Sequence, residues 1–365
     1  MAWGKKGAHA RIENAGVTAG TGSSGASKRG AAEASRRWSR KLIGVAVAAC
    51  VIAGTVPVVA GLAAANDPAY GWYTVDPSAT TFTLNSSRDW RGFVELVNGT
   101  ADTNGDGSHT SADAPAQTFA GKTVVLGSSL NFLGAAVKPA GGQGASSFDG
   151  TLDGNGKTID NVVIDASDGV QNVELIGRAG EPSLIKDVTV GAGVRLSLAQ
   201  DAEGAAIANV GLLTGSSAGD LQGCTSKGSL TVESAVAQTA ELYFPVLNVG
   251  GVVGICTGDV AACANEGAIS ISETSAPRTE NEQNNIVANV GGVVGSAGAV
   301  DTTVDKNAEN VHGMVSSCTN MGSMHIETPS EGGKDRFGNP MYAQSTNVGG
   351  VAGYSRSDRD RKSVV

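Results

Sequence analysis

Apolar and polar positions alternate in short runs through the C-terminal two thirds of the chain, where no segment keeps the 3.6-residue spacing of a helix. Apolar residues two positions apart, such as Leu230 and Val232 or Ile269 and Ile271, predict strands with one apolar face. Further strands are predicted at these places: Thr123–Leu126, the run containing Ile159, Val162 and Ile164, Val173–Ile176, Ile185–Val190 and Val194–Leu198. The pattern therefore predicts an all-β fold.

One earlier segment does have helical spacing. Its apolar residues fall at i, i+3, i+4 and i+7: Trp90, Phe93, Val94 and Val97. They predict a helix over Ser87–Asn98, with Ser87 as the N-cap and Gly99 after its end. A stack of strands leaves an open end that needs cover, so we expect this short helix to cap it and its aromatic side chains to cover the core.

The strands belong to a repeated phrase. Asn-Val-Gly-Gly-Val-Val-Gly, or a close variant, begins at Asn209, Asn248, Asn289 and Asn347, which are 39, 41 and 58 residues apart. A second phrase, in which Cys is followed by Gly and then by a predicted strand, begins at Cys224, Cys263 and Cys318. These cysteines follow the first three asparagines by 15, 15 and 29 residues. Repeats with insertions at a fixed place are typical of a solenoid, here a parallel β-helix over residues 122–353. One turn of such a helix takes about 20–25 residues, so each unit is predicted to contain two turns.

Composition agrees with a core of small and branched residues, because the chain has 52 Gly and only 4% aromatic residues. Residues 66–121 are expected to form an N-terminal cap with an inserted loop. The block from Gly150 to Ile164 is expected to form an early turn of the stack, with a bend at Asp153–Gly156.

The N-terminal 65 residues have the order of an export signal. Residues 1–41 form a basic, Gly/Ala/Ser-rich segment that we expect to be disordered, with nine Lys/Arg, two acidic residues and a net charge of +7. Residues 42–65 are apolar and end in Ala-Ala-Ala, which predicts either a signal peptide cleaved after Ala65 or a retained anchor. Both alternatives place the rest of the chain outside the cytoplasm, secreted or at the cell surface.

The exported part carries a net charge of −16, which argues against nucleic acid and anionic lipid as partners. Membrane contact is expected only through residues 42–65, if these are uncleaved.

The repeat phrases and the Phe148–Ile159 block resemble the GLUG-type repeats of bacterial adhesin-like surface proteins, over roughly residues 80–353. The resemblance implies a right-handed parallel β-helix that serves as a stalk or adhesive segment. Similar repeats accompany the catalytic domain of some immunoglobulin A proteases. The His-Glu-x-x-His zinc motif of that class is absent from this sequence.

The best candidate for metal binding is the segment from Asp102 to Asp113. Asp102, Asn104 and Asp106 occupy positions 1, 3 and 5 of a calcium loop, Gly107 occupies position 6 and Asp113 occupies position 12. Position 12 is Asp rather than the usual Glu. The alternative to a calcium-binding loop is a polar surface loop that binds no metal. If Ca²⁺ binds, it would stiffen the loop; no other cofactor is expected.

Four cysteines follow the predicted export signal: Cys224, Cys256, Cys263 and Cys318. With two turns per unit, equivalent positions would lie about 10 Å apart, beyond the reach of a disulfide. We therefore expect an inward ladder of reduced cysteines; a Cys256–Cys263 disulfide is the alternative.

Acidic residues near Gly150 allow one enzymatic hypothesis. Parallel β-helices include polysaccharide lyases and glycosidases that use clustered carboxylates, and the candidates here are Asp149, Asp153, Asp160 and Asp165, with Lys157 nearby. The same residues suit Gly-rich bends, which is the interpretation we favour.

The sequence thus predicts a non-catalytic bacterial surface module that binds a host or matrix glycoprotein, a glycan or neighbouring surface proteins. The contact surfaces are expected in the insertions Glu273–Asn285, Ala299–Met314 and Thr328–Thr346. The alternatives are a carbohydrate-active enzyme and a non-catalytic region of a larger surface protease. Residues 354–365 form a charged tail just after another unit has begun, so we expect the natural protein to continue or this chain to be a truncated product.

Overall fold

The structure is a computed structural model that describes residues 67–142, 146–164, 172–200, 207–234, 246–273, 287–298, 313–327 and 346–355. These residues belong to one compact unit and are mostly in parallel β-sheets, as the sequence predicted. The expected signal or anchor at 42–65 lies outside the described residues. Within them, no helix has both the length and the apolar character needed to cross a bilayer.

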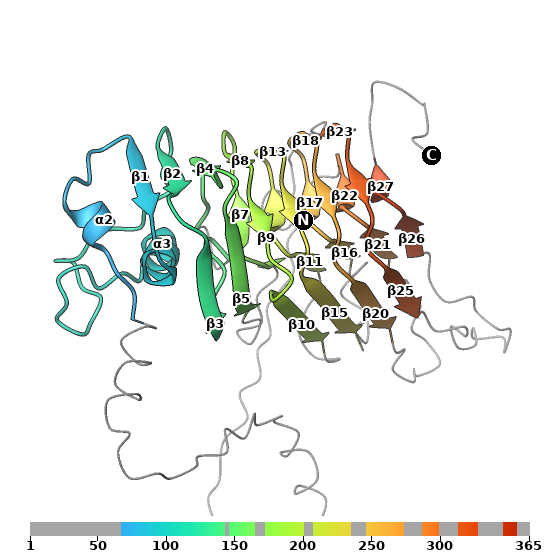
Figure 1. Ribbon diagram of the computed structural model, residues 1–365, viewed down its shortest axis with the longest axis horizontal. Helices are drawn as coiled ribbons and strands as arrows, with labels where there is room; N and C mark the ends of the chain where they lie inside the picture. Colours follow the sequence, from blue (N-terminus) through green and yellow to red (C-terminus); the bar gives the residue numbers. More distant parts are fainter. Residues whose placement is uncertain are drawn as a thin grey trace, which may run out of the picture. The chain divides into compact units, whose positions relative to one another are not determined.

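Four parallel sheets contain the strands (Figure 1). The seven-stranded sheet runs through β1 (Thr81–Leu84), β2 (Thr123–Leu126), β4 (Thr151–Asp153), β8 (Leu184–Lys186), β13 (Asp220–Gln222), β18 (Val260–Ala261) and β23 (Val315–Ser316). The ten-stranded sheet contains β3 (Leu130–Val137), β5 (Thr158–Ile164), β9 (Thr189–Val190), β10 (Arg195–Gln200), β14 (Thr225–Ser226), β15 (Ser229–Ser234), β19 (Ala264–Asn265), β20 (Ile269–Glu273), β24 (Thr319–Asn320) and β25 (Met324–Glu327).

The two remaining sheets have five strands each. One contains β6 (Asn172–Val173), β11 (Ile207–Gly211), β16 (Val246–Gly250), β21 (Val287–Gly291) and β26 (Thr346–Gly349). The other contains β7 (Ile176–Ala179), β12 (Thr214–Ser217), β17 (Val253–Cys256), β22 (Val294–Ala297) and β27 (Ala352–Ser355).

Strands from successive repeat units pair directly and in register. Asn209 of β11 faces Asn248 of β16, which faces Asn289 of β21, which faces Asn347 of β26. We call the strands of one unit a rung: β11–β15, β16–β20 and β21–β25 are three such rungs, followed by β26 and β27. The prediction of two turns per unit is therefore wrong, because the 39- and 41-residue units each advance the sheets by a single strand.

An earlier rung, β6–β10, has the same order of strands, although it was not recognised as a repeat. Asn172 and Val173 of β6 pair with Asn209 and Val210, and Thr189 of β9 pairs with Thr225. Two residues obscure the repeat phrase in this rung. Glu174 follows Asn-Val where later units have glycine, and Val188 precedes β9 where later units have cysteine.

Two predicted strands are broken by bends. Val173–Ile176 is interrupted between β6 and β7, and Ile185–Val190 is interrupted at Asp187, which has φ 54°. The same corner in later rungs is formed by Gly223, Ala262 and Ser317, with φ values of 64°, 53° and 54°. Four residue types occupy one left-handed position, so the corner is set by the stacking of rungs and not by a turn residue.

Glycines of the repeat phrase permit close backbone contact between rungs. A Cβ at Gly254 would lie 2.5 Å from the Val210 nitrogen, and one at Gly295 would lie 2.6 Å from the Val249 nitrogen. A Cβ at Gly251 would lie 2.4 Å from the Gly292 carbonyl oxygen of the next rung. At these three glycines a side chain would collide with neighbouring backbone, which accounts for glycine there, although the first copy of the phrase has the buried Leu212 at the position of Gly251.

The apolar residues of the rungs form buried columns. In the seven-stranded sheet, one column joins Phe82, Val124, Leu152, Ile185, Leu221 and Val260, all of which are fully or almost fully buried. Stacking identical units thus continues one core from rung to rung.

The N-terminal region joins the same core. Helix α2 (Gly71–Thr74) is followed by β1, and α3 (Ser87–Asn98) contacts β1 and β3. Trp90 and Phe93 of α3 are fully buried, and Phe93 packs against Phe148 with ring centroids 5.5 Å apart. The predicted core-covering role of these aromatic side chains is consistent with their burial.

The helix boundaries match the prediction, but its cap is Ser86 and not Ser87. The Ser86 hydroxyl accepts from the Asp89 amide, and the Asp89 carboxylate accepts from the Ser86 amide. Such a reciprocal capping box needs an acid at the third helical residue, and Asp89 stands three residues after Ser86. Gly99, with φ 68°, ends the helix.

Substituting Gly292 by Ala should destabilise the stack. The new Cβ would lie 2.2 Å from the Gly350 carbonyl oxygen and 2.3 Å from Cγ of Asn320. We expect the free energy of unfolding to fall by about 1–3 kcal/mol, as for overpacked cores, in urea titrations followed by circular dichroism. Gly350→Ala is the matched control, because it stands at the same position one unit later and has no atom within 4 Å of its Cβ site. Equal stability of the two variants would contradict the close-contact explanation.

Candidate functional site

The tip of the predicted calcium loop is organised around Asp102. Its carboxylate accepts hydrogen bonds from the backbone amides of Gly105 (2.8 Å), Asp106 (3.1 Å) and Gly107 (2.8 Å). Asn104 accepts from the Asp106 amide through its side-chain oxygen at 2.8 Å. These side chains are exposed or half-buried, and the local bonds give the loop a defined shape without an ion.

Asp113 closes the base of this loop. It is buried, and its two oxygens accept from the amides of Thr110 (2.8 Å) and Asn104 (3.0 Å) and from the Thr103 hydroxyl (3.2 Å). Hydrogen bonds from the Thr110 amide, then from Asn104 and Thr103, hold the pKa of Asp113 below its ordinary value despite burial. The predicted twelfth ligand therefore connects the two ends of the loop.

The four predicted ligands lie in one loop, but their oxygens are directed to backbone donors. In the part of the chain that the structure describes, no three His, Cys, Asp or Glu side chains form a group that could hold a metal ion. Calcium binding stays a prediction, since an ion would need to share the Asp102 carboxylate with three amides.

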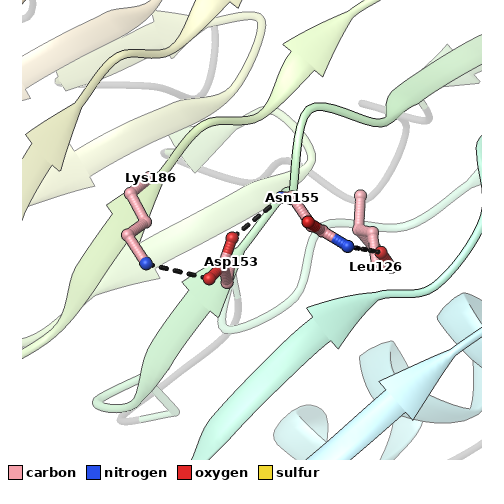
Figure 2. A network of polar contacts seen from close by, with 4 residues as sticks. All are labelled: Leu126, Asp153, Asn155 and Lys186. Carbon is pink, nitrogen blue, oxygen red and sulfur yellow. Dashed lines mark hydrogen bonds and ion pairs between the residues drawn. The ribbon is translucent and has the colours of Figure 1, made fainter.

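Asp153, one of the candidate carboxylates of the enzymatic hypothesis, lies in a network of structural polar contacts (Figure 2). Asp153 of β4 pairs in register with Lys186 of β8, and their side chains form an ion pair of 2.8 Å. The Asn155 amide also donates to Asp153 at 2.8 Å, while the Asn155 side chain donates to the Leu126 carbonyl oxygen at 3.4 Å. Burial opposes the effect, but Lys186 and the Asn155 amide lower the pKa of Asp153 below its ordinary value.

The other candidates are distributed over different bends. Asp149 accepts from the Ser147 hydroxyl at 2.6 Å, and Asp160 accepts from the amides of Asn161 and Gly193, both at 2.8 Å. Lys157 belongs to the bend between β4 and β5, and Asp165 lies outside the described residues. The three described carboxylates have the local bonds typical of turn-forming Asp, as the favoured interpretation expected.

Cysteines of successive rungs lie one strand apart. Cys224, Cys263 and Cys318 immediately precede β14, β19 and β24, whose residues pair in register. The spacing of about 10 Å inferred from the sequence is therefore wrong, because adjacent strands lie about 4.8 Å apart. All four described cysteines are drawn as free thiols, and only Cys318 is partly exposed; the reduced state stays a prediction.

The surroundings shift the pKa values of the thiols in both directions, and a hydrogen bond with the Cys263 thiol lowers the pKa of Cys224. Burial raises the pKa of Cys256 to about 12. Contact with the Cys224 thiol, together with burial, raises the pKa of Cys263 to about 12. Since the thiolate is the reactive species, these two residues are held in their unreactive form.

An asparagine ladder runs through the first position of the repeat phrase. Asn248 donates to the Asn209 side-chain oxygen (2.8 Å), Asn289 donates to Asn248 (2.9 Å) and Asn347 donates to Asn289 (2.9 Å). The first three are buried, where an unpaired amide would be costly. The repeat signalled these residues in the sequence, but their function became evident only from the register.

Glu174 was not identified from the sequence. It is fully buried, both carboxyl oxygens lack a hydrogen-bond partner of good geometry, and a Cβ at Gly215 would lie 2.0 Å from its Oε2. Burial raises the pKa of Glu174 well above its ordinary value, opposed only by the nearby Gly215 amide. A departure from the repeat phrase was the available signal, because Glu174 stands where later units have glycine.

Comparisons with protein-family models, with curated proteins and with solved structures found no match to this chain.

Replacing Glu174 by Gln should stabilise the protein at neutral pH. Below pH 4.5 the carboxyl group is protonated in both states; above it, the unfolded chain loses the proton first and the folded state loses stability. Wild-type stability should therefore fall, relative to Glu174→Gln, by up to about 1.4 kcal/mol per pH unit between pH 4.5 and the raised pKa. Urea titrations of both proteins from pH 4 to pH 8 measure this difference.

Asp153→Asn provides a control of opposite sign. The pKa of Asp153 is lowered in the folded state, so its stabilisation is present at neutral pH and is lost as the pH falls toward and below its ordinary value of 3.8. A constant difference between wild type and Glu174→Gln across the range would show that Glu174 is not protonated in the folded protein.

Cys256 and Cys263 should resist thiol reagents until the protein unfolds. In residues 66–365, we expect a colorimetric thiol assay to detect four thiols in guanidinium, with Cys256 and Cys263 silent under native conditions. Val75→Cys, at a side chain that is 88% exposed, should add one thiol that reacts at once. Fewer than four thiols in guanidinium without reductant would reveal a disulfide and contradict the reduced ladder.

Proposed function

We propose that this chain is an exported, non-catalytic module of the bacterial surface, in which a right-handed parallel β-helix serves as an adhesive or spacing segment. The observation that carries the proposal is the in-register pairing of successive repeat units, with Asn209, Asn248, Asn289 and Asn347 in one ladder. A stack in which each unit repeats the contacts of the previous one gives length and rigidity without a catalytic centre.

The positions of the insertions support a binding role. The connections from β15 to β16, from β20 to β21 and from β25 to β26 all leave the ten-stranded sheet and enter the same five-stranded sheet. The predicted insertions Glu273–Asn285 and Thr328–Thr346 belong to this set, and most of their residues lie outside those that the structure describes. The strands from which these segments leave are neighbours, about 4.8 Å apart, and this proximity supports a shared binding role for the segments.

Helix α3 is proposed as the cap of the first rungs. It contacts β1 and β3, Arg91 donates to the Ala136 carbonyl oxygen at 3.0 Å, and Asn98 donates to that of Pro139 at 2.9 Å. Bonds to backbone near the end of β3 suit an element that covers strand ends.

The favoured partner is a host or matrix glycoprotein or glycan, or a neighbouring surface protein. A repeat region of a larger surface protease would have the same architecture and the same non-catalytic role. A carbohydrate-active enzyme is less well supported, because Asp149, Asp153 and Asp160 are bonded to local structural donors.

Residues 66–365 should bind one class of glycan or matrix glycoprotein saturably on an array and leave it unchanged. If calcium stiffens the predicted loop, chelation and Asp102→Asn should weaken this binding to the same extent, whereas Asp76→Asn, an exposed acid outside the loop, should have no effect. Mass spectrometry of the array ligands checks for cleavage. Shortened polysaccharide products would overturn the non-catalytic proposal, and the absence of any saturable ligand would contradict the adhesive one.

A further inference from the structure

Three cysteines of successive rungs lie next to one another in one column. The Ala264 amide donates to the Cys224 carbonyl oxygen at 2.9 Å, and the Thr319 amide donates to the Cys263 carbonyl oxygen at 3.0 Å. Each cysteine is therefore one strand away from the next, about 4.8 Å. The Cys263 thiol contacts the thiols on both sides, those of Cys224 and Cys318. Each neighbouring pair is thus within the Cα–Cα range of a disulfide, about 4.4–6.8 Å, contrary to the spacing inferred from the sequence.

Cys263 is the central thiol of this column. Cys224 and Cys318 lie on either side of it and are two strands apart, about 9.6 Å, which is beyond the limit of about 7 Å for a disulfide. Only one disulfide can therefore form among the three cysteines, and it must include Cys263. Cys256 belongs to a different column, because its register partners in β12 and β22 are a serine and an alanine.

We propose that Cys263 is an oxidation site, which forms a disulfide with Cys224 or Cys318 while the chain folds in the presence of a small-molecule disulfide. One cysteine thiolate attacks the small disulfide, forms a mixed disulfide and releases one thiolate. The second cysteine thiolate then attacks the protein sulfur of the mixed disulfide and releases the other thiolate. Two protein thiols are thereby oxidised, and the small disulfide is reduced to two thiols, which take up the two protons.

Burial decides when this reaction takes place. Cys224 is fully buried and Cys263 almost fully, so a reagent reaches them only before the rungs close. A protein that is already folded and reduced therefore keeps its thiols, whereas a chain that folds in an oxidising compartment acquires the disulfide. The bond would join two rungs of the stack covalently. The oxidising setting rests on the proposed export of the chain, but the chemistry depends on neither the export nor the adhesive role.

Refolding of the full chain in a glutathione redox buffer, in which disulfides reshuffle, tests this proposal. Cys50 in the predicted export segment is replaced by Ser, which leaves the four described cysteines. We expect two thiols after refolding, all four after reduction, and a linked pair of peptides that contains Cys263 and either Cys224 or Cys318. The same oxidation in guanidinium should instead link Cys256 to Cys263, because these two are only seven residues apart and a shorter loop closes at a lower entropic cost.

Variants of this protein distinguish pairing within the column from random pairing. Cys263→Ala should leave the three remaining thiols unpaired, whereas Cys256→Ala, the matched control, should still form the disulfide. Adding Val188→Cys to Cys263→Ala should restore one disulfide with Cys224, because the residue after Cys224 donates its amide to the Val188 carbonyl oxygen at 2.9 Å. Thermal unfolding followed by circular dichroism checks that each variant folds. Four thiols in the refolded parent protein, a Cys256–Cys263 disulfide in it, or a disulfide in Cys263→Ala would overturn the proposal.

Discussion

Direct backbone pairing between equivalent strands of successive repeat units is the constraint on which the rest of this structure depends. Because the strands pair in register, every position of the phrase lies on the same position of the next unit. An apolar residue then continues an apolar column, and a glycine lies where the neighbouring backbone passes closest. The same constraint makes the sequence repetitive, since a change at one position affects contacts on both sides.

Buried polar groups are accommodated in two contrasting ways. The asparagines of the ladder each pair with the asparagine of the adjacent rung, so that their desolvation is compensated along the series. Glu174 has no such series, because it occurs once, and burial raises its pKa well above the ordinary value, which favours the uncharged form. A repeated polar residue can thus be satisfied by its own copies, whereas a single one cannot.

Most of the acidic residues that the sequence suggested as calcium ligands or catalytic carboxylates accept local hydrogen bonds in the structure. Asp102 and Asp113 organise a loop, Asp160 stabilises a bend, and Asp153 forms an ion pair across two strands. The sequence predicted these motifs as clusters of oxygen ligands, and in the structure backbone amides donate hydrogen bonds to those oxygens. These bonds stabilise the loops and bends in which the acidic residues lie.

The sequence by itself determined the all-β class of the repeat region and the position of α3, because the two-residue and 3.6-residue periods are local properties of the backbone. It predicted α3 and β2 with their observed ends and the burial of Trp90 and Phe93. It could not determine how many residues make one rung, because that depends on which distant strands share hydrogen bonds. The corner at Asp187, Gly223, Ala262 and Ser317 has no common residue type, so nothing local marked the bends that divide one unit into five strands. Tertiary structure alone decided the spacing of the cysteines, the pairing of the asparagines and the burial of Glu174, since each depends on what the neighbouring rung places opposite it.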